Sequence, residues 1–168
     1  MNTAKIIIIR GNSGSGKSTI SKALQEKLMK DTLLIPHDMV RMVMVGQYGE
    51  MIGNPSVKLL ENLVAYGQQN FSYVILEGIL NSYIYKSVFN MIKETYKEQI
   101  FAYYFDLPIE ETVKRHIERD FHEFGEKELR EWFVEKDFIP NIKEKILTKE
   151  MSRDEIIDMI YQDLMNRS

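Results

Sequence analysis

The chain has 168 residues, and its hydrophobic content of 44% and charged content of 28% are ordinary for a globular protein. This length suits a single hydrophobic core, so we expect residues 1–168 to form one domain. The absence of cysteine excludes disulfides, thiolate chemistry and cysteine-based zinc sites, and the net charge of −3 argues against a nucleic-acid duplex or an anionic membrane as partner.

The first predicted element is a buried strand over residues 6–10, because consecutive isoleucines make a short apolar run there. This run is too short to cross a bilayer, and it is not part of a cleavable leader. The lack of cysteine also agrees with a reducing compartment. We therefore expect a cytoplasmic protein without a membrane partner.

Residues 11–18 read Gly-Asn-Ser-Gly-Ser-Gly-Lys-Ser, which fits the Walker A pattern G-x-x-x-x-G-K-[ST] at every fixed position. A helix is predicted over residues 18–29, because Ile20, Ala23, Leu24 and Leu28 share one helical face. A glycine-rich loop between a strand and a helix is the arrangement of a phosphate-binding loop, or P-loop. The alternative is a Gly/Ser-rich turn that matches by chance, and the flanking elements argue against it.

The chemistry of a P-loop explains the residues of this segment. Glycines allow consecutive backbone N–H groups to converge on one point, and the following helix adds the positive end of its dipole. We expect Lys17 to reach the β- and γ-phosphate oxygens of a nucleotide and the Ser18 hydroxyl to hold Mg²⁺. The predicted nucleotide-binding residues are Gly11, Asn12, Ser13, Gly14, Ser15, Gly16, Lys17, Ser18 and Thr19.

Strands and helices are predicted to alternate along the rest of the chain. Apolar and aromatic runs predict strands at residues 33–36, 73–76, 100–105 and 145–148. Helical spacing and capping signals predict helices at residues 38–45, from Asn54-Pro55 onward, at 82–96, from Pro108 onward, at 126–134 and from the capping box at Ser152 onward. This alternation predicts an α/β fold, in which a parallel sheet is covered on both faces and ligands bind beyond the carboxyl ends of its strands.

Asp38 stands at the end of the second predicted strand, where phosphoryl transfer needs a carboxylate to orient an acceptor hydroxyl and take its proton. Arg41 comes one helical turn later and is expected on the same side as Asp38. It is placed to bind an anionic group of the acceptor or to approach the transferred phosphoryl group. The alternative is that Asp38 only caps the short helix that follows.

Two more strand ends carry charged candidates. Glu77 follows an apolar strand in a Walker B-like pattern, so we expect it to hold Mg²⁺ or to orient a reactant, while Gly78 lets the chain turn close to the substrate. After the fourth predicted strand, Arg115 and Arg119 share one helical face and are candidates for crossing a bound nucleotide. The alternative for Arg115 is a surface ion pair with Glu111, four residues earlier.

Together these motifs resemble a known family. The P-loop, Pro-His-Asp-Met-Val-Arg at residues 36–41, Leu-Glu-Gly at residues 76–78 and the segment from Phe-Asp-Leu-Pro to Arg-His-Ile-Glu-Arg at residues 105–119 are similar to the small P-loop kinases of the adenylate-kinase-like fold. Within that group, the chain is most similar to the branch that contains zeta toxins, chloramphenicol phosphotransferase and the kinase domain of polynucleotide kinases. The resemblance covers nearly the whole chain.

The resemblance implies a three-layer sandwich around a five-stranded parallel sheet of order 2-3-1-4-5, with a small helical lid at about residues 119–140. It also implies ATP and Mg²⁺ as cofactors, and it places adenine near residues 149–151. The residues that correspond to the catalytic groups of such kinases are Lys17, Asp38, Arg41, Arg115 and Arg119, and the expected metal-binding residues are Ser18 and Glu77.

Two departures from the family bear on function: Glu77 replaces the commoner Walker B aspartate, and no dense basic patch for nucleic acid is present. We therefore expect an ATP-dependent phosphotransferase that acts on a hydroxyl of a small-molecule acceptor. The alternatives are a 5′-hydroxyl kinase of nucleic acid or a nucleoside, and a non-catalytic ATP-binding module. The acceptor site is expected within residues 41–69, where Met42, Met44, Tyr48 and Met51 form either an adaptable apolar wall or part of the core. The sequence does not determine the oligomeric state.

Overall fold

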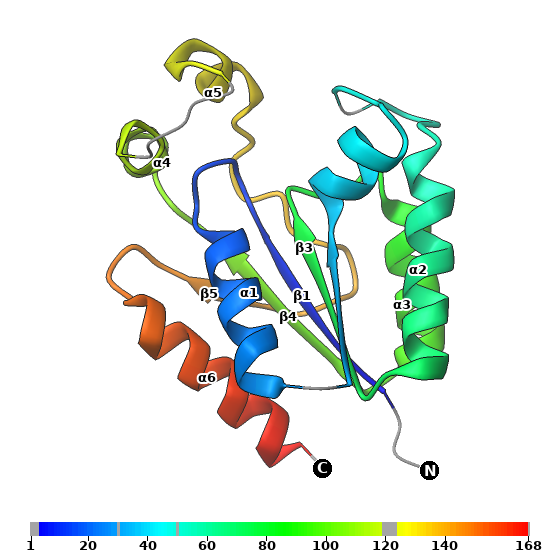
Figure 1. Cartoon of the computed structure of the whole chain (residues 1–168). Coiled ribbons are helices and arrows are strands. Elements are labelled where there is room, and N and C mark those ends of the chain that lie inside the picture. The colour runs from blue at the N-terminus through cyan, green and yellow to red at the C-terminus, as the bar shows by residue number, and fades with distance from the viewer. Residues whose placement is uncertain (1–3, 30, 50, 119–123, 168) are drawn as a thin grey trace.

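The computed structural model describes residues 4–29, 31–49, 51–118 and 124–167, in which strands and helices alternate (Figure 1). The strands are β1 (Lys5–Gly11), β2 (Thr32–Pro36), β3 (Tyr73–Gly78), β4 (Ile100–Phe105) and β5 (Glu144–Leu147). The helices are α1 (Lys17–Leu28), the π-helix η1 (Met39–Met44), α2 (Ser56–Asn70), α3 (Lys86–Tyr96), α4 (Ile109–Ile117), α5 (Glu126–Trp132) and α6 (Arg153–Asn166). Within these ranges, no helix combines the length and the apolar character that a membrane span requires.

The strands of the described chain pair in parallel in the order β2-β3-β1-β4-β5. The predicted α/β fold and the strand order are thereby confirmed, although the last strand begins at Glu144, one residue before its expected start. Because β1 lies between β3 and β4, the loop that follows it leaves the sheet at the middle of its edge.

Two apolar cores hold helices against opposite faces of the sheet and give the fold its three layers. Successive side chains of a strand point to opposite faces, so Ile6 and Ile8 belong to one core and Ile7 and Ile9 to the other. The first core packs α2 and α3, on the right in Figure 1, and the second packs α1 and α6, on the left. All four isoleucines are fully buried, which is why their run is continuously apolar.

The predicted helix at residues 82–96 begins later than expected, at Lys86. The Asn81 side chain accepts the backbone N–H groups of Tyr83 and Ile84, at 3.0 and 3.1 Å. These bonds offer the backbone an alternative to a helical turn. A turn held by the Asn81 side chain therefore precedes α3, and the helix begins four residues after its predicted start at residue 82.

The segment after Asp38 forms the π-helix η1 instead of a regular helical turn. The N–H group of Val45 donates to the C=O of Val40, five residues earlier, at 3.2 Å. The wider turn buries Val40 and Arg41 and exposes Met39 at the start of the element and Val43 and Met44 at its end. Such turns are rare and occur frequently at functional sites.

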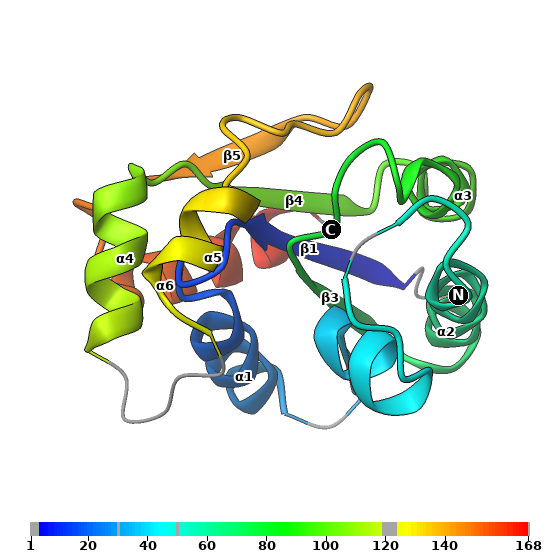
Figure 2. The same ribbon diagram turned by 90° about the horizontal axis from the view of Figure 1, so that it is seen from above.

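Helices α4 and α5 lie beyond the carboxyl ends of the strands, above the sheet in Figure 1. Their contact is aromatic: the Phe124 ring stacks on His116 of α4 at 4.8 Å, and Trp132 at the end of α5 meets the edge of Phe124 at 5.0 Å. The predicted helix at residues 126–134 is α5 and ends two residues early. Seen from above in Figure 2, α4 and α5 lie close to the loop that joins β1 to α1.

Arg10 joins three segments at the carboxyl end of β1. Its side chain is fully buried, and its guanidinium donates at 2.8–3.1 Å to the C=O of Leu80, to both the C=O and the carboxylate of Asp137, and to the carboxylate of Glu144. These contacts use all five N–H donors of a guanidinium. Two ring centroids also lie within about 5.5 Å of its Cζ, those of Phe89 and Tyr104.

Replacing this cation should destabilise the fold strongly. We expect Arg10→Met to lower the free energy of unfolding by about 3–5 kcal/mol, because Asp137 and Glu144 would keep their carboxylates without the buried partner. Urea denaturation followed by circular dichroism measures the change. The matched control is Arg153→Met, on an exposed residue at the start of α6, for which the change should stay within about 0.5 kcal/mol. An unfolding midpoint for Arg10→Met equal to that of the unmutated protein would contradict the assignment.

Candidate active site

The carboxyl ends of β1, β2 and β3 bring the predicted site residues to one edge of the sheet. In the register of the strands, Ile9 of β1 and Pro36 of β2 both lie opposite Glu77 of β3. The loop after β1 therefore lies on one side of Glu77, and the residues that follow Pro36 lie on the other. Figure 2 looks onto this edge from above.

The loop at residues 11–16 has the backbone of a phosphate cradle. Gly14 and Gly16 have φ of 78° and 103°, values that other residues rarely adopt, and Gly16 directly precedes the first residue of α1. Positive φ at Gly14 and Gly16, with Ser15 between them, turns successive backbone N–H groups toward one point, where an anion binds. The start of α1 adds its dipole at the same place. The backbone of the loop therefore fits a nucleotide phosphate.

Lys17 lies across this loop. Its Nζ donates to the C=O of Asn12 at 2.8 Å and to Ser15 Oγ at 3.4 Å, and the residue is only 8% exposed. The ammonium group is thus held at the cradle, where it can exchange these oxygens for those of a phosphate.

The two predicted metal ligands, Ser18 at the start of α1 and Glu77 at the end of β3, contact each other directly. The Ser18 hydroxyl donates to Glu77 Oε1 at 3.1 Å. Two oxygen donors at this spacing fit Mg²⁺, which binds through one or two protein oxygens together with water and substrate phosphates. Among the described residues no group of three or more potential ligand side chains is found, so a cation here would need phosphate oxygens as well.

Burial raises the pKa of the Glu77 carboxyl above its ordinary value, while the nearby Lys17 ammonium and the hydrogen bond from Ser18 act in the opposite direction. The charged form of Glu77 is therefore disfavoured in the folded protein. A divalent cation would supply positive charge that stabilises the ionised carboxylate. The environment of Glu77 is therefore compatible with the metal-binding role predicted for it.

Asp38 and Arg41 lie next to each other, as their spacing predicts. Arg41 Nη2 donates to Asp38 Oδ1 at 3.2 Å, with the arginine side chain 9% exposed and the aspartate side chain 61% exposed. Asp38 makes no side-chain capping bond to η1, so the interpretation of Asp38 as only a helix cap is wrong. An exposed carboxylate oriented by a buried cation remains at the mouth of the site.

His37 precedes Asp38 in the chain; from the sequence alone it is either an acceptor contact or a structural histidine, and it is not among the predicted site residues. It is fully buried, its Nε2 forms a hydrogen bond with the Tyr85 hydroxyl at 2.6 Å, and its Nδ1 lies 3.9 Å from Asp38 Oδ1. Burial lowers the pKa of His37 to about 4; Asp38 opposes this shift, and Arg41 and Lys17 add to it. The imidazole is therefore neutral at physiological pH.

Arg115 reaches the P-loop from α4. Its Nη1 donates to the C=O of Ser15 at 2.9 Å, and its Nε donates to Glu111 Oε1 at 2.7 Å. The predicted ion pair with Glu111 is therefore present, and the same guanidinium contacts the predicted phosphate cradle; a nucleotide-binding role of Arg115 stays a prediction. Arg119, the other predicted arginine, lies outside the described residues.

Asn12, predicted as part of the cradle, lies in the loop and uses its side chain to bind a residue outside the predicted site. The amide forms hydrogen bonds with the backbone of Val134, two residues beyond the end of α5. No local pattern indicates this pairing, because the partners are 122 residues apart.

The segment beside Asp38 and Arg41 presents apolar side chains to solvent. Met44, Tyr48 and Met51 are 57%, 73% and 56% exposed, so their interpretation as core residues is wrong. Met42 is half-buried. A role of these side chains in binding an acceptor stays a prediction.

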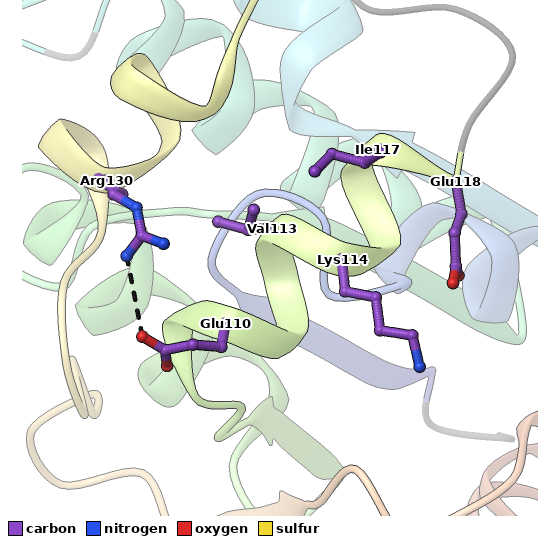
Figure 3. A pocket seen from close by; sticks show the side chains of 6 residues that line it. All are labelled: Glu110, Val113, Lys114, Ile117, Glu118 and Arg130. Atoms are coloured by element: carbon purple, nitrogen blue, oxygen red, sulfur yellow. Dashed lines mark ion pairs between the residues drawn. The ribbon is translucent and has the colours of Figure 1, made fainter.

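A hollow of about 390 Å³ lies between α4 and α5, apart from the predicted catalytic residues (Figure 3). An ion pair of 3.8 Å between Arg130 of α5 and Glu110 of α4 crosses one end of it. The other residues that line it are Val113, Lys114, Ile117 and Glu118. The residues that line this hollow come from α4, its C-terminal end and α5, so we interpret the hollow as part of the packing between these two helices.

No protein-family model matches the sequence, and no curated protein matches it. Solved structures match the whole chain in fold. A gluconokinase from Sinorhizobium meliloti 1021 has a TM-score of 0.69 at 14% identity, over 99% of this chain and 94% of that one. The APS kinase of Mycobacterium tuberculosis, solved with AMPPNP and APS, has a TM-score of 0.68 at 16% identity over 99% of both chains.

A third match is the tunicamycin resistance protein of Deinococcus radiodurans, with a TM-score of 0.63 at 14% identity over 96% of this chain and 95% of that one. The chain therefore has the fold of P-loop kinases along nearly its whole length. The motif at residues 11–18 lies in that fold where a P-loop is expected, between β1 and α1.

The close approach of Gly78 to His37 makes a specific prediction. A Cβ at position 78 would lie 2.5 Å from His37 Cβ, so Gly78→Ala should lower the free energy of unfolding by about 1–3 kcal/mol through overpacking. Urea denaturation measures it. Adding His37→Gly in the same chain should recover part of that loss relative to His37→Gly alone; strictly additive effects would show that the two residues do not press on each other.

A second prediction concerns pH. The pKa of Glu77 is raised on folding, so in the unmutated protein the stability cost of this group is absent below the ordinary carboxyl pKa, about 4.3. The cost grows as pH rises from that pKa toward the raised one and is complete above it. Glu77→Gln removes that cost. Without Mg²⁺, we expect the variant to gain stability relative to the unmutated protein between pH 4 and pH 8, as measured by urea denaturation at both values.

The control for this prediction is Glu98→Gln, on an exposed residue, whose stability difference should not change between the two pH values. A stability difference for Glu77→Gln that moves in the unfavourable direction as pH rises would refute the buried-carboxylate argument.

Proposed function

We propose that the protein is an ATP- and Mg²⁺-dependent phosphotransferase that moves the γ-phosphoryl group of ATP to a hydroxyl of a small-molecule acceptor. The observation that carries the proposal is the meeting of Lys17, the Ser18–Glu77 pair and exposed Asp38 at one sheet edge. A phosphate cradle, a carboxylate suited to a metal and a carboxylate open to solvent are the parts that phosphoryl transfer needs. The likeness in fold to kinases supports it, although one fold hosts many activities.

On the nucleotide side, the loop amides and Lys17 bind the β- and γ-phosphates, and Ser18 and Glu77 hold Mg²⁺. The bound metal supplies positive charge to the phosphate oxygens. Arg115 already contacts the loop at Ser15, so a small movement of its guanidinium brings it onto the triphosphate. In this proposal Arg119 has the same role, and adenine binds near residues 149–151.

On the acceptor side, Asp38 acts as the base. Arg41 occupies its Oδ1, which leaves Oδ2 to align the acceptor hydroxyl and take its proton. The neutral His37 adds no positive charge beside this carboxylate, and Arg41 orients it electrostatically. The exposed apolar residues of the adjoining segment supply a wall for the body of the acceptor.

The pairing of Asp38 with Arg41 also supports a place in the branch of zeta toxins, chloramphenicol phosphotransferase and polynucleotide kinases. We further propose a single kinase domain over residues 1–168 with a lid at about residues 119–140, which excludes water during transfer. The net charge of −3 favours a small acceptor over a nucleic acid. A non-catalytic ATP-binding module would have no use for the oriented carboxylate of Asp38.

The test separates binding from transfer. Calorimetry with Mg–ATP should give a saturable heat for the unmutated protein and none for Lys17→Ala, because the cradle loses its charge. Asp38→Asn should keep the ATP dissociation constant within about twofold and lower turnover about 10²–10⁴-fold. Turnover is measured on an acceptor found by thermal-shift screening of nucleosides, sugars and aminoglycoside-like alcohols with AMPPNP.

The control variant is Asp154→Asn, on an exposed residue of α6, which should keep both binding and turnover. Full turnover in Asp38→Asn would remove the base assignment. The whole proposal fails if Mg–ATP gives no heat of binding with the unmutated protein.

A further inference from the structure

The Asn12 side chain pairs with a single distant residue through both halves of its amide. Its Nδ2 donates to the C=O of Val134 at 2.8 Å, and its Oδ1 accepts the N–H of Val134 at 3.0 Å. Asn12 occupies a position where the P-loop pattern requires no particular residue type, and it is 8% exposed. Two aligned hydrogen bonds to one residue hold that residue in register with the loop, as neighbouring strands hold each other.

Val134 lies at a point that matters for α4 and α5. It follows Trp132, the last residue of α5, by two positions. On the other side of the helix pair, Arg115 of α4 donates to the C=O of Ser15. The P-loop therefore contacts the pair α4–α5 from both ends, through Ser15 and through Asn12.

The two attachments of the segment after α5 differ in their surroundings. Three residues beyond Val134, Asp137 is fixed by the fully buried guanidinium of Arg10, with every donor of that group used. This contact involves no residue of the phosphate cradle. Of the two attachments, the Asn12 contact is the one that involves a cradle residue, so it is the one that can respond when the cradle is filled.

The main chain of Asn12 supplies the link to ligand binding. Lys17 Nζ donates to the Asn12 C=O at 2.8 Å, and a phosphate in the cradle would draw the ammonium group to its own oxygens. The residue that loses a hydrogen bond to Lys17 is thus the residue whose side chain holds Val134. Asn12 therefore contacts both Lys17 in the cradle and Val134, two residues beyond the end of α5.

We infer that Asn12 is a positioning residue that couples the occupancy of the P-loop to the placement of α5 through its amide pairing with Val134. The inference rests on the proposed binding of a nucleotide, but it assigns to Asn12 a role apart from phosphate contact. It makes the pair α4–α5 respond to the nucleotide before any acceptor binds.

The chain carries its own reporter for this coupling. Trp132 is the single tryptophan of the sequence. It lies at the end of α5, is 51% exposed and contacts the ring of Phe124 at 5.0 Å. A shift of α5 changes both the solvent exposure and the ring contact of this indole, so its fluorescence follows α5 directly.

The experiment titrates the full chain with Mg–AMPPNP and records Trp132 fluorescence and calorimetric heat in parallel. For the unmutated protein, we expect a saturable fluorescence change whose midpoint equals the calorimetric dissociation constant. Val134→Pro, outside the loop, deletes the N–H that Asn12 Oδ1 accepts and should keep that constant within about threefold, roughly 0.7 kcal/mol, while the fluorescence amplitude falls to less than half. Asn12→Ala should lose amplitude in the same way when compared at saturation. The control is Asn70→Ala, which removes a hydrogen bond from the side-chain amide to the C=O of Tyr66 on α2 and should keep the full amplitude.

Two further outcomes keep the inference separate from the proposed function. If the unmutated protein binds with heat but without any change in Trp132 fluorescence, the coupling is refuted and the phosphotransferase proposal stands; if it gives no heat, both fail. Should Asn12→Ala lose binding altogether, Val134→Pro decides, because it deletes the N–H that Asn12 accepts without altering the loop. Full amplitude in a variant that binds, whether Asn12→Ala or Val134→Pro, overturns the inference.

Discussion

The buried guanidinium of Arg10 is the contact on which the geometry of the candidate site depends. One cation at the end of β1 holds the segment after β3 through Leu80, the segment before β5 through Asp137 and the first residue of β5, Glu144. Each of these partners would bear a desolvation cost without the cation, so they share one arrangement. The P-loop begins at the next residue, Gly11, and therefore starts from a fixed point in the middle of the sheet edge.

Burial divides the charges around that edge into two kinds. Lys17 and Glu77 are buried close to the phosphate cradle. A bound cation would stabilise the Glu77 carboxylate, whose pKa is raised, and a bound anion would stabilise the Lys17 ammonium group. Asp38 is exposed and oriented by buried Arg41, which suits contact with a molecule that arrives from solvent. The proposed function follows from this division, since a metal nucleotide satisfies the first kind and an acceptor hydroxyl the second.

Most of the fold was predictable from the sequence, because its signals are local. The isoleucine run and the helical spacing of apolar residues placed the strands and most helices, whereas the resemblance supplied the strand order. The start of α3 was misplaced because a side chain, Asn81, competes with the helix for backbone N–H groups. Within the site, Lys17 and Ser18 and the strand-end residues meet as expected, since parallel strands end at one edge.

By itself, then, the sequence determined the P-loop, the alternation of strands and helices and the candidate residues at the strand ends. These features depend on the spacing of residues that are close in the chain, and such spacing can be read from a single sequence. Only the tertiary structure decided that Arg10 binds Asp137, that His37 is held neutral against Tyr85 and that Asn12 pairs with Val134. Each of these contacts joins residues 48 to 127 positions apart, and which side chains meet at such separations is set by the packing of whole elements and the exclusion of water between them.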